Sequence, residues 1–235
     1  MSNNYSNNIP PDSISRDQIY AGDVAKHLDR ITHEFADGFD FLKKYPRSVT
    51  IFGSSLAKPT DQTYIDAVKL GEKIVKELNY AVVTGGGPGI MEAANKGAYE
   101  AGGASLGVNV SLPHERSSNA YVTQSIKCSY FFSRKTILMF AAECFVFFPG
   151  GFGTMDELFN VLTLIQTDKI PRVPVVLFDS EYWKPFQSFL SKVTEGKYHA
   201  VDDDSLALFE ITDSLDRVIE IISKAPVSET WRNIN

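Results

Sequence analysis

Short apolar runs alternate with longer segments of helical periodicity along most of the chain. The run CFVFFPG at residues 144–150 is apolar to its end, as expected of a central parallel strand buried on both faces. Residues 20–42 carry apolar side chains at helical spacing, which predicts one helix packed on the outside of the fold or against a second subunit. The same patterns predict strands within residues 48–55, 80–84, 104–113, 121–128, 173–179 and 206–212, helices within 60–78, 89–101, 130–143, 182–193 and 213–223, and a further helix after Thr154.

This alternation predicts the fold class. Strands joined through helices form parallel sheets, so we expect an α/β fold with a doubly wound parallel sheet and helices on both faces. Ligands of such sheets bind outside the carboxyl ends of the strands. A chain of 235 residues can bury one substantial core, and we expect a disordered polar tail at residues 1–18 and a single domain at 19–235.

Composition narrows the classes of partner. The net charge is −6 and no long Lys/Arg block occurs, which argues against nucleic acid as the main partner. The polar start and the lack of a long uncharged apolar stretch predict neither a signal peptide nor a membrane span, and we expect a cytoplasmic protein. Cys128 and Cys144 lie in apolar surroundings and are expected to be buried free thiols. The four histidines show no metal-ligand spacing, so we expect no metal and no cofactor.

Three predicted strands end in glycine- or serine-containing turns: FGSS at 52–55, TGGGPG at 84–89 and PGGFGT at 149–154. Glycines let a ligand approach the backbone N–H groups, and each following helix adds the positive end of its dipole, so the turns predict an anion-binding crevice. One such turn is as readily a sharp strand-to-helix connection, and only the three together favour a ligand. PGGFGTMDE lacks the lysine of a Walker A loop and GGGPGIME does not match G-x-G-x-x-G in register, so a dinucleotide is weakly supported.

Glu157 has two interpretations. Residues 154–157 fit a capping box, in which Thr154 caps the helix and the glutamate bonds back to the cap, and spacing alone favours this structural role. A phosphate bound at the turn would compete for the same N–H groups and hydroxyl, and would leave Glu157 free to face the rest of the ligand. Near a helix N-terminus its carboxylate is expected to stay ionised, which suits stabilisation of a cation.

The motif PGGFGTMDE matches the pattern P-G-G-x-G-T-x-x-E, and GGGPGIMEAANKGA and SRKT accompany it. With these motifs the chain resembles, over roughly residues 47–223, the LONELY GUY (LOG) family of phosphoribohydrolases, proteins often mislabelled lysine decarboxylases. The resemblance implies a Rossmann-like nucleotide-binding fold and a homodimer or larger homo-oligomer. It also implies hydrolysis of the N-glycosidic bond of a nucleoside 5′-monophosphate, of the AMP or cytokinin riboside monophosphate type, to free base and ribose 5-phosphate.

The resemblance further implies roles for single residues. In the family the glutamate that ends the signature and the arginine of the R-K pair are catalytic, and here they are Glu157 and Arg134. The sequence does not decide whether Arg134 contacts the phosphate, the ribose or the leaving base. Phe132 stands where the family often has methionine, which bears on the fit of the base. A decarboxylase would need a pyridoxal-binding lysine, and Lys135 beside an arginine is not by itself such a site. The phosphate and nucleotide are expected to contact Gly150, Gly151, Gly153, Thr154, Ser54, Gly86, Gly87, Gly89, Glu92 and Lys135.

Other interpretations stay open. A non-catalytic nucleotide or molybdenum-cofactor carrier on the same fold would need the glycine turns, but not the acid and the arginine together. The apolar face of residues 20–42 also fits an oligomeric scaffold, which leaves the three turns unexplained. Glu92 is either a ribose contact or an acid that complements a helix dipole. His114, Glu115 and Asn119 follow the third strand, where they form either a lid over the base or a plain surface loop.

Overall fold

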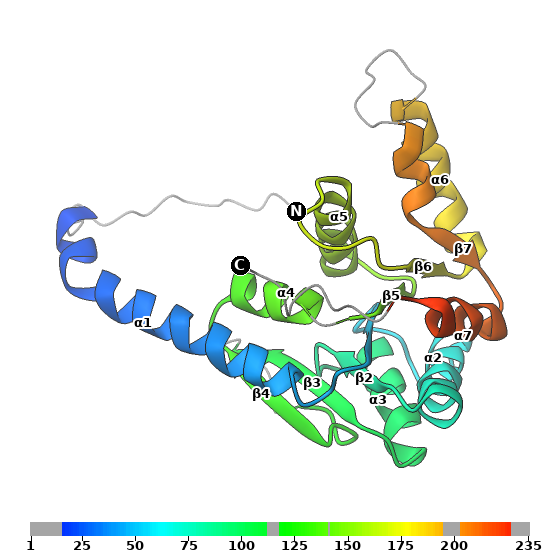
Figure 1. Ribbon diagram of the computed structural model, residues 1–235, viewed down its shortest axis with the longest axis horizontal. Helices are drawn as coiled ribbons and strands as arrows, with labels where there is room; N and C mark the ends of the chain where they lie inside the picture. Colours follow the sequence, from blue (N-terminus) through cyan, green and yellow to red (C-terminus); the bar gives the residue numbers. More distant parts are fainter. Residues whose placement is uncertain (1–15, 112–117, 141, 195–202, 227–235) are drawn as a thin grey trace, which may run out of the picture.

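The computed structural model describes residues 16–111, 118–140, 142–194 and 203–226 (Figure 1). Over these residues seven parallel strands form one sheet in the order β4-β3-β2-β1-β5-β6-β7, which confirms the predicted α/β, doubly wound, Rossmann-like fold. The strands are β1 (Ser48–Phe52), β2 (Ala81–Thr84), β3 (Ser105–Val110), β4 (Gln124–Cys128), β5 (Cys144–Phe147), β6 (Val175–Phe178) and β7 (Glu210–Thr212). The α-helices are α1 (Arg16–Leu42), α2 (Gln62–Lys73), α3 (Ile90–Glu100), α4 (Phe131–Phe140), α5 (Phe152–Gln166), α6 (Ser180–Thr194) and α7 (Leu215–Lys224).

The strand order reverses between β1 and β5. From β1 the chain builds outward through β2 and β3 to β4, and then returns to place β5 on the other side of β1. Val49 lies opposite Cys144 and Phe52 opposite Phe147, so the two strands end level with each other. In an open α/β sheet such a switch point opens a crevice outside the carboxyl ends of the strands. The turns FGSS and PGGFGT, which follow β1 and β5, therefore flank this crevice.

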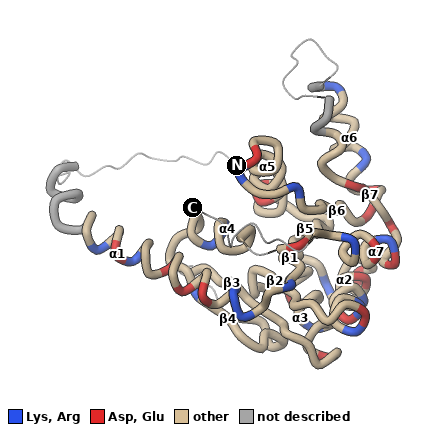
Figure 2. The backbone as a smooth tube through the Cα atoms, viewed as in Figure 1, with Lys and Arg blue, Asp and Glu red and all other residues tan. Residues whose placement is uncertain are grey.

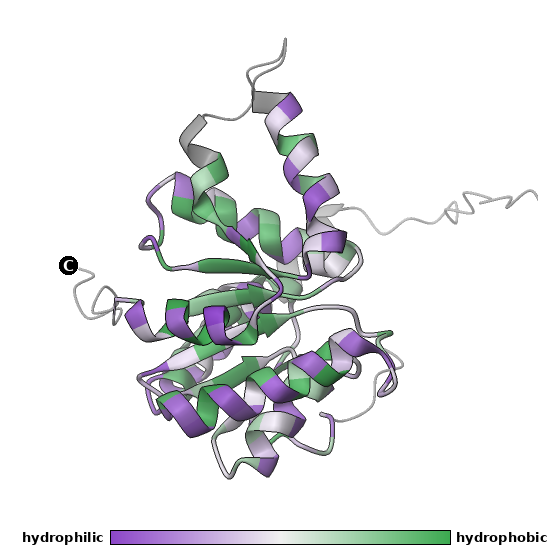
Figure 3. Ribbon diagram, turned by 90° about the vertical axis from the view of Figure 1, so that its right-hand side faces the viewer, coloured by the Kyte–Doolittle hydropathy of each residue, from purple (hydrophilic) through white to green (hydrophobic). Residues whose placement is uncertain are grey.

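Side chains of β5 and of Phe148, which directly follows it, alternate between two separate hydrophobic cores. Phe145 and Phe147 lie in one cluster, Cys144, Val146 and Phe148 in the other, and all five are fully buried. Helices α1, α4, α5 and α6 contribute to the first cluster, and α2, α3 and α7 to the second. Figure 3 shows the apolar strands in green between helices that turn purple, hydrophilic sides outward. A strand buried on both faces needs an apolar residue at every position, which explains the uninterrupted run CFVFFPG.

Helix α1 is the extra N-terminal helix, and it extends beyond the sheet (Figure 1). Its last residues, Phe41 and Leu42, belong to the first core, whereas basic and acidic residues recur along the rest of its coloured length (Figure 2). The helix begins at Arg16, so residues 16–18, placed in the tail by the sequence, are helical. The rest of the expected tail, residues 1–15, lies outside the described residues.

The strand expected at residues 206–212 is shorter in the structure. Only Glu210–Thr212 pair with β6, and Asp203–Leu208 form a 3₁₀ helix. Leu208 and Phe209 are buried in the first core, so side-chain burial, and not strand pairing, accounts for the apolar pattern here.

The two cysteines lie in the hydrophobic interior. Cys128 and Cys144 are buried free thiols, as predicted, and burial raises the pKa of the Cys128 thiol to about 11. No helix in the described ranges is long and apolar enough to cross a membrane. Within the same ranges no group of three or more histidine, cysteine or acidic side chains is arranged to hold a metal ion.

Candidate functional site

The three glycine and serine turns meet at the switch point. The Ser54 N–H donates to the Pro149 carbonyl at 2.9 Å, and the Ile90 N–H donates to the Ser54 carbonyl at 2.9 Å. A Cβ on Gly89 would overlap the backbone of Ser54, and one on Gly150 would come within 3.0 Å of the Ser54 nitrogen. The turn after β1 is therefore wedged between the turns after β2 and β5, and the close approach requires glycine on both sides.

The turn after β5 presents free backbone donors. Helix α5 starts at Phe152 with Gly151 as its N-cap, so the N–H groups of Phe152, Gly153 and Thr154 have no acceptor inside the helix. Gly151 and Gly153 are exposed, and a Cβ on either would meet open space, while Thr154 is buried beneath them. N–H groups at the positive end of a 15-residue helix can bind an anion such as a phosphate.

The capping-box interpretation of Glu157 is wrong. With Gly151 at the N-cap, Thr154 is the third residue of α5 and Glu157 the sixth, beyond the first turn. A capping box requires the threonine at the N-cap and the glutamate three residues later. The helix starts earlier than the spacing suggested because Gly151 supplies the extended N-cap conformation itself.

Glu157 is a buried acid with an unsatisfied oxygen. Its side chain is 7% exposed, and its Oε2 has no hydrogen-bond partner among the described residues. Burial raises the pKa of Glu157 to about 7, although the positive charges of Lys135 and Arg134 act in the opposite direction. Burial therefore opposes the ionised carboxylate that the helix end favours, and close to neutral pH this carboxyl can either give up or accept a proton.

Arg134 is anchored at the carboxyl ends of β2 and β3. Its Nε donates to the Val108 carbonyl at 2.9 Å and its Nη2 to the Gly85 carbonyl at 3.4 Å. A Cβ on Gly85 would overlap the guanidinium, so only glycine lets Arg134 lie against this turn. The arginine is thus fixed on one side of the crevice, close enough to Glu157 to favour the ionised carboxylate.

Lys135 and Glu92 both have partners in the structure. The Lys135 ammonium contacts both carboxylate oxygens of Asp156 at 2.9 Å, and Asp156 is the immediate neighbour of Glu157 on α5. Glu92, in the first turn of α3, accepts a hydrogen bond from the Tyr64 hydroxyl at 3.0 Å. Neither Asp156 nor Tyr64 was singled out from the sequence, because each lies outside a glycine turn and its partner comes from another helix.

A buried polar network supports the turn after β2. Asn95 Oδ1 accepts from the Thr84 hydroxyl at 2.6 Å and from the Asn119 amide at 3.0 Å. The Asn119 amide also donates to the Gly87 carbonyl, and its backbone N–H donates to the carbonyl of Gly86, whose φ of +73° favours glycine. Asn119 therefore does more than line a surface loop, since it fixes the shape of the turn. The other two candidates from that loop, at positions 114 and 115, lie outside the described residues.

With this geometry in view, comparison with known proteins places the chain. A family model described as "Possible lysine decarboxylase" matches residues 91–222, more than half of the chain. The chain belongs to this family. Its curated relatives carry the LOG name, so the predicted resemblance to the LOG family is confirmed. The pairing of Lys135 with Asp156 is a surface ion pair and gives the word decarboxylase no support.

Two relatives in the LOG family illustrate the similarity. The cytokinin riboside 5′-monophosphate phosphoribohydrolase LOG of Oryza sativa subsp. japonica is 31% identical over 154 residues, which cover 64% of this chain and 63% of that protein. The cytokinin riboside 5′-monophosphate phosphoribohydrolase of Rhodococcoides fascians is 28% identical over 153 residues, covering 62% of this chain and 74% of that one. The chain thus matches less than two thirds of the length of the rice relative.

Solved structures share the fold. The molybdenum cofactor binding protein of Rippkaea orientalis superposes with a TM-score of 0.54 at 25% identity, over 75% of this chain and 94% of that chain. The molybdenum cofactor carrier protein of Chlamydomonas reinhardtii gives a TM-score of 0.53 at 24% identity, over 76% and 99%. The second similarity is one of fold alone.

Proposed function

We propose that this chain hydrolyses the N-glycosidic bond of a nucleoside 5′-monophosphate, of the AMP or cytokinin riboside monophosphate type, to the free base and ribose 5-phosphate. The observation that carries the proposal is Glu157, a buried carboxyl in the second turn of α5, one oxygen of which has no hydrogen-bond partner among the described residues. An unsatisfied buried polar group costs about 1–3 kcal/mol, and a ligand bound at the turn would recover part of it. The activities named for the rice and R. fascians relatives support the same reaction.

The 5′-phosphate is assigned to the turn after β5. The N–H groups of Phe152, Gly153 and Thr154, which have no acceptor inside α5, would donate to the phosphate. The Thr154 hydroxyl lies beside Gly150 at the base of the turn. The Ser54 hydroxyl oxygen accepts from the Leu56 N–H at 3.1 Å, which leaves its proton available for a phosphate oxygen. Binding energy from the phosphate then positions the ribose, which favours monophosphates over nucleosides.

The chemistry is assigned to Glu157 and Arg134. Water adds to the anomeric carbon as its bond to the base nitrogen breaks, and the base leaves with the bonding electrons and takes up one proton. Positive charge develops on the ribose, where ionised Glu157 stabilises it and receives the proton of the attacking water. Glu157 then releases this proton through solvent as the base takes one up, so that one water molecule supplies the hydroxyl of ribose 5-phosphate and the proton of the free base. Arg134 is anchored on β2 and β3, and neighbouring strands lie about 4.8 Å apart, so its anchor at β2 is roughly 10 Å from β5. We therefore assign Arg134 to the ribose or the leaving base, and not to the phosphate.

Incubation with AMP and other nucleoside monophosphates tests the proposal. Chromatography should show free base and ribose 5-phosphate in equal amounts, and adenosine should react far more slowly than AMP. If AMP binds but is recovered intact, the hydrolase assignment fails.

A carrier protein is the second candidate, because the R. orientalis molybdenum cofactor binding protein shares the fold at 25% identity. A carrier would use the three turns and would not need Glu157 and Arg134 together. The AMP incubation separates the two candidates, since a carrier retains its ligand unchanged.

We also propose a homo-oligomer, in line with the family. Val24 and Leu28 on α1 are 42% and 58% exposed, and Phe131 and Phe132 at the start of α4 are 55% and 48% exposed. Exposed apolar side chains of this size are typical of protein contacts. Sedimentation velocity should give a mass of at least twice 26.1 kDa, and a monomeric mass at micromolar concentration would contradict the proposal.

A further inference from the structure

A fourth strand end reaches the candidate site through Tyr182. This residue lies in the first turn of α6, after β6, and outside each of the three turns described above. Its hydroxyl donates to the Gly150 carbonyl at 2.5 Å, across 32 positions in the sequence. It is the hydroxyl, at the tip of the side chain, that touches the turn after β5.

Contacts with Asp179 and Trp183 hold the tyrosine in place. Its backbone N–H donates to the Asp179 carboxylate at 3.2 Å, and its ring packs edge-on against Trp183 with centroids 4.8 Å apart. Trp183 is completely buried, and its indole N–H donates to the Phe178 carbonyl at 3.0 Å. A side chain on such a support can hold a backbone group in one orientation without large loss of its own freedom.

The hydrogen bond fixes a peptide plane. The Gly150–Gly151 peptide is trans, so the Gly151 N–H points opposite to the Gly150 carbonyl. With the carbonyl held by Tyr182, the N–H of Gly151 points away from α6. Gly151 is the N-cap of α5, so this N–H immediately precedes the N–H groups at the helix start in the chain. Glycines on both sides of the peptide would otherwise let it flip readily.

We propose that Tyr182 is a positioning residue for the anion site: by holding the Gly150 carbonyl, it directs the Gly151 N–H toward the 5′-phosphate of the ligand. This inference rests on the proposed function for the identity of the ligand. The binding of an anion here is inferred from the turn after β5 alone. A phosphate oxygen would then receive one more backbone donor than the helix end alone provides.

Tyr182→Phe removes the hydroxyl and keeps the ring, and Tyr182 is exposed enough, at 36%, for the variant to fold. The Kd values of AMP, ribose 5-phosphate and inorganic phosphate are measured by calorimetry for the wild type and the variant. We expect each to rise about 3- to 10-fold, the effect of one hydrogen bond. In the AMP assay KM should rise by the same factor, with kcat within about twofold. Tyr99→Phe, at the far end of α3 and 50% exposed, is the matched control and should leave every value unchanged.

The outcomes separate the inference from the proposed function. One outcome is that the phosphate compounds bind, that Tyr182→Phe raises their Kd, and that the wild type does not hydrolyse AMP. The positioning role then stands and the hydrolase proposal fails. If AMP is hydrolysed and Tyr182→Phe behaves like Tyr99→Phe, the positioning role is wrong. A fall in kcat or melting temperature with unchanged phosphate affinity would also overturn it, and so would a wild type that binds none of the three phosphates.

Discussion

Glu157 is the side chain on which the proposed reaction depends most. Glu157→Gln keeps the shape of the side chain and removes its charge. We expect AMP turnover to fall at least about 100-fold, because a charge that stabilises the transition state contributes about 3 kcal/mol. The Kd of AMP, measured by calorimetry, should change by less than about threefold, since the phosphate donors remain.

Glu143→Gln is the matched control for this test. Glu143 is also buried, at 2% exposure, and burial raises its pKa to about 7 as well. It lies at the amino ends of the strands, where its Oε2 accepts from the Ser48 N–H at 2.6 Å, far from the crevice. Turnover should therefore persist in this variant. Unchanged turnover in Glu157→Gln would leave that residue with a structural role only.

The glycines of PGGFGT differ in what an added methyl group would meet. In Gly150→Ala the methyl would overlap Thr154 Oγ1 and press on the Ser54 backbone, so we expect AMP affinity to fall about tenfold or more. In Gly153→Ala the methyl meets open space within a helix, which should raise the free energy of unfolding by about 0.5–1 kcal/mol. Thermal unfolding and AMP titration of both variants check this contrast. A similar loss of stability in the two variants would contradict the expected contrast and show that the turn tolerates a methyl group at neither position.

Single residues also show what the sequence can and cannot reveal about the site. The glycine turns and Glu157 were found because a strand, a turn and a helix start are local patterns. Spacing alone favoured the capping role and was misleading, because the position of a helix start depends on the backbone of one residue, Gly151, which spacing does not give. Tyr182 and Asn119 reach the site from distant segments, so only the folded chain brings them to it.

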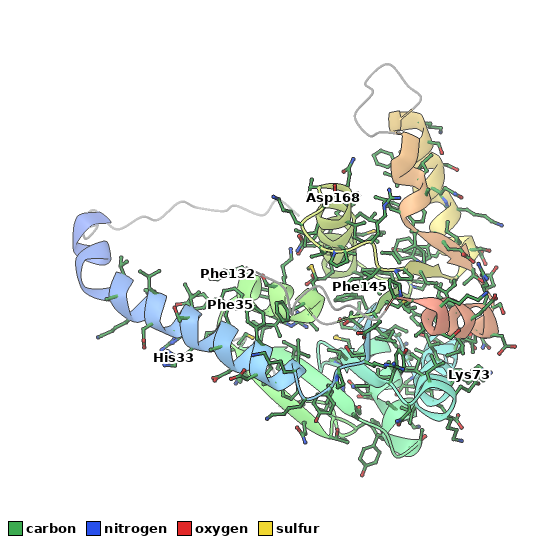
Figure 4. The ribbon with its side chains drawn as sticks, in the orientation of Figure 1. His33, Phe35, Lys73, Phe132, Phe145 and Asp168 are labelled. Carbon is green, nitrogen blue, oxygen red and sulfur yellow. The ribbon has the colours of Figure 1, made fainter. Side chains whose placement is uncertain are left out.

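Helix α1 packs against α4, the helix that carries Arg134. Phe39 stacks on Phe140 with ring centroids 3.9 Å apart, and Gly38 lets the helices approach so closely that a Cβ there would overlap Ile137. Nearer the start of α4, Glu34 accepts from the Ser129 N–H at 2.6 Å. Figure 4 shows Phe35 on the side of α1 that faces α4. The contacts follow α4 from its start to its end, so α1 helps to place the arginine.

Phe39→Ala tests whether the packing of α1 against α4 positions α4. Losing the stacked ring should lower the free energy of unfolding by about 2 kcal/mol, less than for a fully buried phenylalanine because Phe39 is half-buried. Amide hydrogen exchange should become faster in residues 131–140, and AMP turnover should fall about threefold or more as α4 loosens. Phe189→Ala on α6, where the ring is 57% exposed, is the control. Unchanged exchange in α4 would mean that the sheet alone positions this helix.

Elements with a distinct apolar pattern were predicted well for a physical reason. Strand β5 is buried on both faces and is a short, uninterrupted apolar run, whereas α3 buries one face and shows helical periodicity. Residues 203–208 were harder, because a 3₁₀ turn that buries Leu208 carries the same apolar content as a short strand. The strand order was beyond the sequence too, since it depends on which strands pair across the switch point.

The stability of the whole molecule should depend on pH through its two buried glutamates. Glu143 and Glu157 lie at opposite ends of the sheet, and burial raises the pKa of each from 4.5 to about 7. Between these values the folded protein binds more protons than the unfolded chain, so the free energy of unfolding falls as pH rises. The stabilisation is fully present below about pH 4.5 and lost above about pH 7.

Exposed carboxylates act in the opposite direction but at lower pH, because ion pairs lower the pKa of Glu220 to about 2 and also lower that of Glu72. The glutamine variants isolate the buried groups, since glutamine carries no proton to lose. Relative to the wild type, Glu143→Gln should gain on the order of 2 kcal/mol in unfolding free energy between pH 5 and pH 8, and Glu157→Gln should gain a similar amount. Urea unfolding at both pH values measures the difference.

A pH-independent difference between Glu143→Gln and the wild type would show that the Glu143 carboxylate is ionised in the folded state, held by the Ser48 N–H and the nearby charge of Arg47. The same result in Glu157→Gln would leave that residue a permanent anion, able to stabilise the ribosyl cation but unable to take the proton of the attacking water.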